Sequence, residues 1–259
     1  MKVTVLGSGA AGGVPMISVG WGRCNPDEPK NRRRRPSILV EEGGKTILID
    51  TSPDLREQLL DAQVRRLDAV LFTHDHADHT HGIDDLREVN RAMGGPIAAY
   101  GTKDCLSRIA SRFSYVFDGI DLATQPIFKP WLVPHEIGEH LDLNGLPIEA
   151  IDQDHGYGRT TGFRFGRMAY CTDVHQFPDS SLERLHGLDL FIVGCLTEYP
   201  HPTHAHLNKV LGWVDHLRPK QTIITHMSPN LDYQALCDQL PSHIRPAFDG
   251  MSIELTAFS

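Results

Sequence analysis

The chain has 259 residues, of which 40% are apolar and 22% are charged. This composition is that of a globular protein and excludes the collagen-like and disordered classes. The formal net charge of −8 disfavours a general surface for nucleic acids, and no run approaches 18 apolar residues, so no membrane-spanning helix is expected.

Short β-branched runs, bounded by Gly, Asp or Pro, mark the predicted strands. They cover residues 2–6, 37–42, 45–50, 67–74, 97–101, 146–152, 161–166, 167–174, 188–194 and 221–226. Helical patterns lie between them, at 52–62, 79–92, 102–113, 178–186, 206–217 and 231–239. Strands with interspersed helices predict a layered α/β fold, and no linker divides residues 1–259, so we expect a single domain.

Two segments have no predicted element, and neither has an assigned role. Residues 20–36 form the longest polar loop and contain the basic run Arg32–Arg35, which is either solvated or steers a phosphate. Residues 118–142 look like a second, irregular insertion.

Gly7, Gly9 and Gly12 follow the first strand in the spacing of a dinucleotide-binding fingerprint. That fingerprint requires a helix at the glycines, but GVPMISVGWG follows and would break one. We therefore predict a glycine turn where the backbone passes close to another group, for which a substrate pocket is the candidate.

The five cysteines are scattered and odd in number, with no CxxC pair. This pattern argues against a disulfide framework and favours a reducing compartment, so we expect a cytoplasmic location.

The segment THDHADH follows the apolar run LDAVLF and crowds histidines and aspartates into six positions. In an extended chain His74 and His76 lie on one side, so both imidazoles can reach one ion. Asp78 and His79 come where the chain turns towards a helix and can reach a second ion. Imidazole and carboxylate suit Zn²⁺, Mn²⁺ or Fe²⁺. The alternative is a solvated polar loop with incidental histidines.

Three further candidate ligands each follow an apolar strand. His155 comes after IEAID, Asp173 after MAYC and His226 after TIIT. One of them alone would be unremarkable, but the three together with the THDHADH segment predict a metal centre.

These residues give the sequence a close resemblance to the metallo-β-lactamase-fold hydrolases. The resemblance covers nearly the whole chain and implies a four-layer αββα sandwich with two divalent metal ions, Zn or Mn. It implies that His74, His76 and His155 hold one ion. It assigns the other ion to Asp78, His79 and His226, with Asp173 bridging the two. Asp50, which ends TILID, matches a residue that supports the ligand loop.

Within this family the closest likeness is to the phosphodiesterase that acts on phosphoribosyl cyclic phosphate, and tRNA 3′-processing nucleases are more distant. The resemblance implies hydrolysis of a small cyclic or nucleotide-like phosphate ester. In HPTHAHLN, His204 matches the catalytic histidine, which would serve the leaving oxygen, and Asp78 is also counted as catalytic. His206 is the second candidate, for substrate binding; the alternative for His204 is to cap the following helix.

The sequence departs from this branch at a structural zinc site. The early loop keeps only Cys24, and Pro229 stands where a histidine ligand would be. We therefore predict no structural zinc, and Cys24 as an ordinary thiol. Two other functions remain open: hydrolysis of another ester, lactone or thioester, and a non-hydrolytic role like that of proteins in pyrroloquinoline quinone biosynthesis. A homodimer is possible, a membrane partner is not expected and a nucleic-acid partner is disfavoured.

Overall fold

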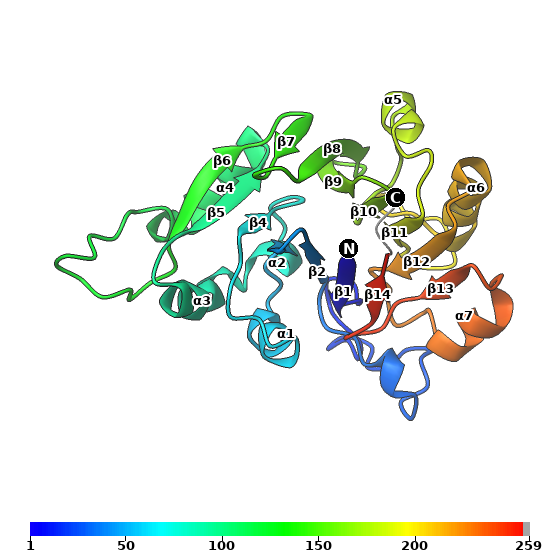
Figure 1. Cartoon of the computed structure of the whole chain (residues 1–259). Coiled ribbons are helices and arrows are strands. Elements are labelled where there is room, and N and C mark those ends of the chain that lie inside the picture. Colours follow the sequence, from blue (N-terminus) through cyan, green and yellow to red (C-terminus); the bar gives the residue numbers. More distant parts are fainter. Residues whose placement is uncertain (256–259) are drawn as a thin grey trace. The chain divides into compact units, whose positions relative to one another are not determined.

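The computed structural model describes residues 1–255, which form two compact units. Unit 1 comprises Met1–Gly7, Ser37–Gly138 and the chain from Gly250 onward, and unit 2 comprises Ser8–Pro36 and Glu139–Asp249. Each unit holds its own sheet (Figure 1). The prediction of a single domain over residues 1–259 stays a prediction.

Unit 1 is built on one mixed sheet, which has seven strands within the described residues. Strands β14 to β3 pair antiparallel, and β3 to β6 pair parallel. In spatial order they are β14 (Ser252–Glu254), β1 (Lys2–Gly7), β2 (Ser37–Glu42), β3 (Lys45–Ile49), β4 (Ala69–Leu71), β5 (Ile97–Gly101) and β6 (Leu132–Glu136). The parallel half places the carboxyl ends of β3, β4 and β5 at one edge.

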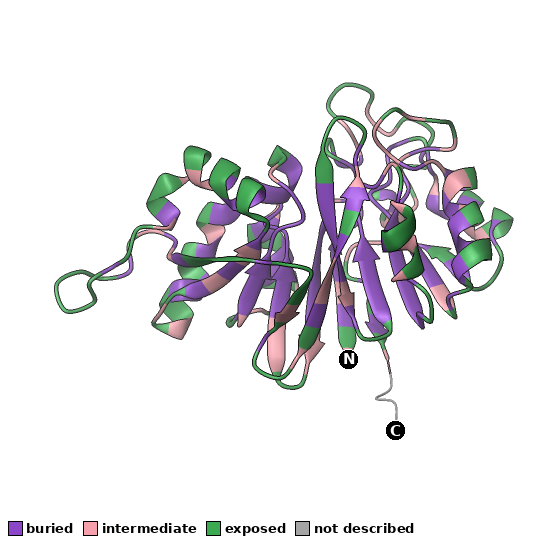
Figure 2. Ribbon diagram, turned by 90° about the horizontal axis from the view of Figure 1, so that it is seen from above, coloured by how far each residue is buried: buried purple, intermediate pink, exposed green. Residues whose placement is uncertain are grey.

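The helices of unit 1 connect its parallel strands. They are α1 (Leu55–Asp61), α2 (Ala77–Thr80), α3 (Leu86–Met93) and α4 (Lys103–Arg112), with 3-10 turns η2 (Ile83–Asp85) and η3 (Ser114–Val116). Leu59, Val89 and Ile109 from α1, α3 and α4 share one apolar cluster with Leu48 and Val70 of the sheet. These three helices therefore cover one face of the sheet, and Figure 2 shows their outer turns exposed.

Unit 2 has the same plan. Its sheet runs β13 (Ile244–Pro246), β12 (Gln221–Thr225), β11 (Leu190–Gly194), β10 (Met168–Cys171), β9 (Arg159–Phe165), β8 (Pro147–Asp154) and β7 (His140–Asp142). Strands β10 to β13 are parallel, and β7 to β10 are antiparallel. Helices α5 (Asp179–Glu183), α6 (Leu207–Leu217) and α7 (Tyr233–Gln239) and the turn η1 (Pro29–Asn31) complete the unit.

Helix α6 shows how a sequence pattern becomes packing in unit 2. Its buried residues recur at helical spacing, and they include Val210, Trp213 and Leu217. The Trp213 ring meets Phe177 with centroids 4.6 Å apart, and Phe177 in turn lies 6.4 Å from Phe191 of β11. This aromatic chain fixes the helix over the parallel strands.

The predicted strands are present, and those expected at 37–42 and 45–50 pair antiparallel as β2 and β3. The helix expected over 79–92 is wrong as one element, because it divides into α2, η2 and α3. The break lies at Gly82, which packs against the loop that follows β3. A Cβ at this position would stand 1.9 Å from the Ser52 carbonyl oxygen, so only glycine fits there.

The expectation of an irregular segment over 118–142 is also wrong in part. Residues Leu132–Glu136 form β6, which pairs with β5, and His140–Asp142 form β7. Pro134 hid the first of these strands, since proline cannot donate a ladder hydrogen bond, but β6 is an edge strand and tolerates it. The remaining loop before β6 extends away from the rest of unit 1 (Figure 1).

The glycine turn at Gly7–Gly12 opens no helix, and the close backbone approach predicted for it is present. A Cβ on Gly9 would lie 3.0 Å from the carbonyl oxygens of Arg33 and Arg34. All five cysteines are free thiols, and no described helix is long and apolar enough to span a bilayer.

Candidate metal centre

The ligand loop of unit 1 follows β4 directly. The ring centroids of His74 and His76 lie 4.4 Å apart, and those of His74 and His79 lie 4.3 Å apart. Asp78 and His79 stand in the single turn of α2, and His76 precedes that turn as its N-cap. The four predicted ligands of this unit are therefore gathered within one loop and one helical turn.

Asp50 anchors this loop from the end of β3. Its side chain is fully buried and accepts hydrogen bonds from the backbone N–H and the hydroxyl of Thr73, both at 2.8 Å. Its Oδ2 also lies 2.7 Å from Nδ1 of His79. A carboxylate can only accept, so this contact places a proton on Nδ1 and leaves the Nε2 lone pair of His79 for a ligand.

The Nε2 atom of His79 lies in a setting that suits a cation. Its Nε2 lies 3.2 Å from Oδ2 of Asp78. In the neutral tautomer that Asp50 selects, two acceptors face each other at this distance. A divalent ion bound by both atoms removes the repulsion, so the donor set fits a metal such as Zn²⁺ or Mn²⁺.

Unit 2 brings together three residues that are far apart in sequence. His155, Asp173 and His226 follow β8, β10 and β12, whose carboxyl ends share one edge of the sheet. Asp173 lies at the centre: its Oδ1 is 3.0 Å from Nε2 of His226, and its Oδ2 is 3.8 Å from Nε2 of His155. Nδ1 of His155 contacts the carbonyl oxygen of Thr203 at 2.8 Å, which again leaves Nε2 as the ligand atom.

Three of these residues have strained backbone. Asp50, Asp173 and His226 have φ values of 65°, 49° and 56°, in the left-handed region that side chains other than glycine rarely occupy. Each stands where the chain leaves a strand and turns sharply. Strain at such positions is a mark of functional sites, because surrounding contacts must hold it in place.

His204 belongs to the unit 2 group. Its ring centroid lies 4.7 Å from that of His155 and 5.0 Å from that of His226, with the latter pair stacked. Burial lowers the pKa of His204 to about 3, against the opposing effect of Asp173. The side chain is therefore a neutral imidazole that retains one N–H donor.

His206 lies in a different setting. It is the N-cap of α6, and the charged neighbours that lower its pKa, after burial, are Lys209 and His175. Those acting on His204 are instead Asp173 and the histidines around it. Of the two candidates, His204 is thus grouped with the predicted ligands of unit 2, and it does not cap α6.

Sequence reasoning missed two residues that contact the predicted histidine ligands, Thr73 and Thr203. Thr73 links Asp50 to the loop, and its hydroxyl also lies 2.9 Å from Nδ1 of His74. The signal available was its place between a buried strand and the first histidine. The carbonyl oxygen of Thr203 carries no such signal, because any residue could supply it.

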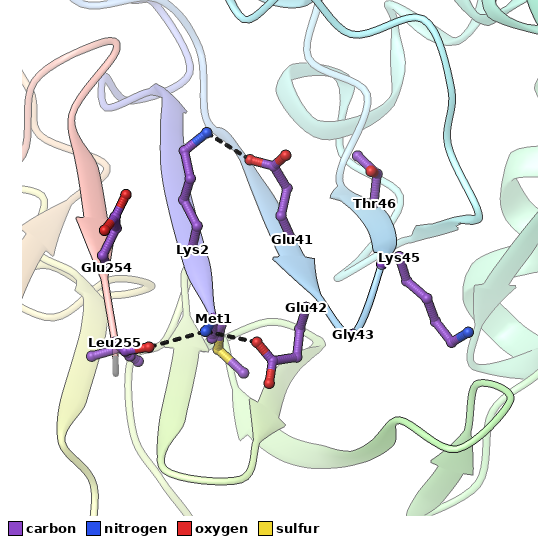
Figure 3. Close-up of a pocket in the computed structure, with 10 residues that line it drawn as sticks. Met1, Lys2, Glu41, Glu42, Gly43, Lys45, Thr46, Glu254 and Leu255 are labelled. Atoms are coloured by element: carbon purple, nitrogen blue, oxygen red, sulfur yellow. Dashed lines mark hydrogen bonds and ion pairs between the residues drawn. The ribbon is translucent and has the colours of Figure 1, made fainter. Parts of the chain in front are cut away.

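A pocket of about 560 Å³ lies elsewhere in unit 1 (Figure 3). It sits beside the start of β3, whereas Asp50 follows the end of that strand. Ion pairs line it, between the terminal amine of Met1 and Glu42 and between Lys2 and Glu41. None of its lining residues among 1–255 is a predicted ligand, so we do not assign the metal centre to it.

Comparison with known proteins agrees with these features. The model of the Beta-lactamase superfamily domain matches residues 45–227. A solved structure described as a new diphosphatase from the PhnP family has 35% identity and a TM-score of 0.89, covering 98% of both chains. Coenzyme PQQ synthesis protein B of Methylobacterium radiotolerans is 33% identical over 243 residues, which are 82% of this chain and 79% of that protein.

A protein of Porphyromonas gingivalis named octanoyltransferase is 32% identical over 254 residues, or 97% of this chain. The chain spans only about half of that relative, 51% of its length. These similarities confirm the predicted metallo-β-lactamase fold and support the prediction of a metal-dependent hydrolase.

Proposed function

Because the chain belongs to the β-lactamase superfamily, we propose that it is a dinuclear metal-dependent phosphodiesterase of a small cyclic or nucleotide-like phosphate ester. One ion would be held by His74, His76 and His155, the other by Asp78, His79 and His226, and Asp173 would serve both. When bound, two divalent cations supply a water nucleophile of lowered pKa and neutralise the phosphoryl charge.

The chain's own residues prepare this chemistry. Asp50 and the Thr203 carbonyl hold His79 and His155 in the tautomer whose Nε2 can bind a metal. His204 is neutral and stands beside the His155–Asp173–His226 group, where its N–H can bind a phosphoryl or leaving oxygen.

One observation carries the proposal above the rest. The PhnP-family diphosphatase resembles this chain over 98% of its length at 35% identity. Its description concerns phosphorus–oxygen bonds, the class of bond that the donor set and His204 suit. We propose a small phosphate ester or diphosphate as the partner, and we expect neither a nucleic acid nor a membrane to be one.

The test uses the purified protein loaded with Mn²⁺ or Zn²⁺. We expect hydrolysis of bis(p-nitrophenyl) phosphate, abolished by chelation and restored by metal. His204→Ala should lower kcat by about 10²- to 10⁴-fold while the metal content stays that of the wild type. His216→Ala, in the last turn of α6, is the control and should retain most activity.

Other outcomes would assign another function. Turnover of thioesters or lactones but of no phosphodiester would favour the alternative hydrolase. Metal binding without turnover of any ester would favour a non-hydrolytic role, as suggested by the 33% identity to coenzyme PQQ synthesis protein B. The native metal, a cytoplasmic location and a homodimer stay predictions, for which metal analysis, fractionation and sedimentation are direct measurements.

A further inference from the structure

Arg33 is a buried cation within a loop that the sequence predicted to be solvated or to steer phosphate. Only 2% of its surface is exposed, whereas its neighbour Arg32 is exposed. Within residues 1–255 no carboxylate forms an ion pair with its guanidinium, although Asp249 and Asp232 act on it at longer range. A buried charge without a paired acid is costly, so its other contacts must explain its presence.

The guanidinium contacts the chain just after His226. Nη1 donates to the carbonyl oxygen of Ser228 at 3.5 Å and lies 3.9 Å from Sγ of Cys24. Nη2 donates to Oδ1 of Asn31 at 3.1 Å. The side chain therefore bridges the early loop and the segment 226–229.

Backbone hydrogen bonds from residues 8–10 and from Arg23 also hold segment 226–229. Met227 donates to the Ser8 carbonyl at 3.0 Å, and the Ala10 N–H donates to the Met227 carbonyl at 3.1 Å. Arg23 donates from its backbone to the Pro229 carbonyl at 2.8 Å. These bonds hold the residues that follow His226, whose left-handed φ of 56° needs external support.

Asn31 connects this hydrogen-bond network to α7. Its Oδ1 accepts from the Tyr233 N–H at 2.8 Å as well as from Arg33, and its Nδ2 donates to Asp232 at 2.6 Å. Asp232 in turn caps α7 by accepting from the N–H of Ala235 at 2.9 Å. The guanidinium is thus held at the centre of a network, not left to sample rotamers.

We propose that Arg33 is a positioning residue for His226. Its buried guanidinium links segment 226–229 to the loop of residues 20–36 through hydrogen bonds to Ser228 and Asn31. These contacts would keep His226, with its strained backbone, in the orientation that metal binding requires. The inference rests on the proposed function in one respect, that His226 binds a metal. It adds that one arginine of the Arg32–Arg35 run sets the affinity of that ion.

The test measures metal content and metal affinity. Arg33→Met keeps the length of the side chain but removes the charge and the donors. We expect it to fold, to bind the ion shared by His74 and His76 as the wild type does, and to bind the second ion about 10- to 100-fold more weakly in chelator competition. Arg33→Lys should recover part of the affinity, and the exposed control Arg32→Met should match the wild type.

The outcomes separate this inference from the proposed function. A wild-type protein without bound metal overturns both. Two tightly held ions in the wild type and equally tight binding in Arg33→Met overturn the positioning role alone. If Arg33→Met fails to fold, Arg33→Lys decides: wild-type affinity for both ions in that folded variant contradicts the need for the guanidinium contacts to Ser228 and Asn31.

Discussion

The predicted ligands are arranged in opposite ways within the two units. In unit 1, His74, His76, Asp78 and His79 lie in one short loop that a single buried carboxylate, Asp50, ties to the end of β3. In unit 2, the predicted ligands are single residues at three strand ends, and the histidines among them are fixed by unrelated contacts. One is the Thr203 carbonyl, and another is the clamp around segment 226–229.

The difference predicts how a substitution in each unit affects its predicted ligands. In unit 1 one change reaches all four ligands at once, because they share a loop and an anchor. In unit 2 a change at one strand end leaves the other two in place, since each rests on its own strand. Asp173 is the exception, because it lies between His155 and His226.

The largest effect is expected at Asp173. Asp173→Asn keeps the size of the side chain but removes the charge that faces both histidines of unit 2, so we expect loss of both ions and activity at background. Elemental analysis and phosphodiester hydrolysis measure this. A variant that retains two ions and measurable turnover would show that Asp173 does not bridge them.

The second effect tests the shared anchor of unit 1. Asp50→Asn keeps one acceptor for Thr73 but no longer selects the His79 tautomer, so the metal affinity should fall by about 10- to 100-fold. Excess metal should restore most activity, which distinguishes this variant from Asp173→Asn. Thr46→Ala, at the start of β3, is a control that should bind metal normally; an Asp50→Asn variant with unchanged affinity would contradict the anchor.

The same contrast explains what could be read from the sequence. The ligand loop of unit 1 is a local pattern, and its residues are neighbours in any fold. His155, Asp173 and His226 were recognisable because each follows an apolar strand. Their proximity depends on the antiparallel pairing of β8 to β10 and the parallel pairing of β10 to β12. His204 required the family resemblance, since nothing in its spacing separates it from His201 or His206.

The clamp of Arg33 could not be predicted. A run of four arginines is typical of a solvated surface, and only the fold shows that Arg33 is buried while Arg32 is exposed. Pro134 hid β6 for a similar reason, because a rule about central strands does not apply at an edge. Sequence patterns report local chemistry well, but they report poorly on which loop a distant segment will contact.

A third prediction concerns the core beneath the ligand loop. Phe72 precedes Thr73 and is fully buried in the apolar cluster of unit 1. Phe72→Ala should lower the free energy of unfolding by about 3–5 kcal/mol, measured by urea denaturation with metal removed. Phe128→Ala, at a half-exposed position, is the matched control and should change it little. Equal effects in both variants would place the stabilising core of unit 1 elsewhere.

The smallest effect tests the network of unit 2 through pH. Burial raises the pKa of Asp232, but the N–H donors of Ala235 and Asn25 and the Asn31 amide outweigh it, so the folded-state pKa lies below the ordinary value. A carboxyl with a lowered folded pKa stabilises the fold above its unfolded pKa of about 3.9, and this stabilisation is lost as the pH falls through the folded pKa.

Asp232→Asn should therefore be less stable than the wild type by about 1 kcal/mol at pH 7, and the difference should shrink below about pH 4. Urea denaturation of both proteins at pH 7 and pH 3 measures the gap. A gap of the same size at both values would mean that the network of Arg33, Asn31 and Asp232 is held by shape and not by the Asp232 charge, and the clamp would then rest on the guanidinium contacts alone.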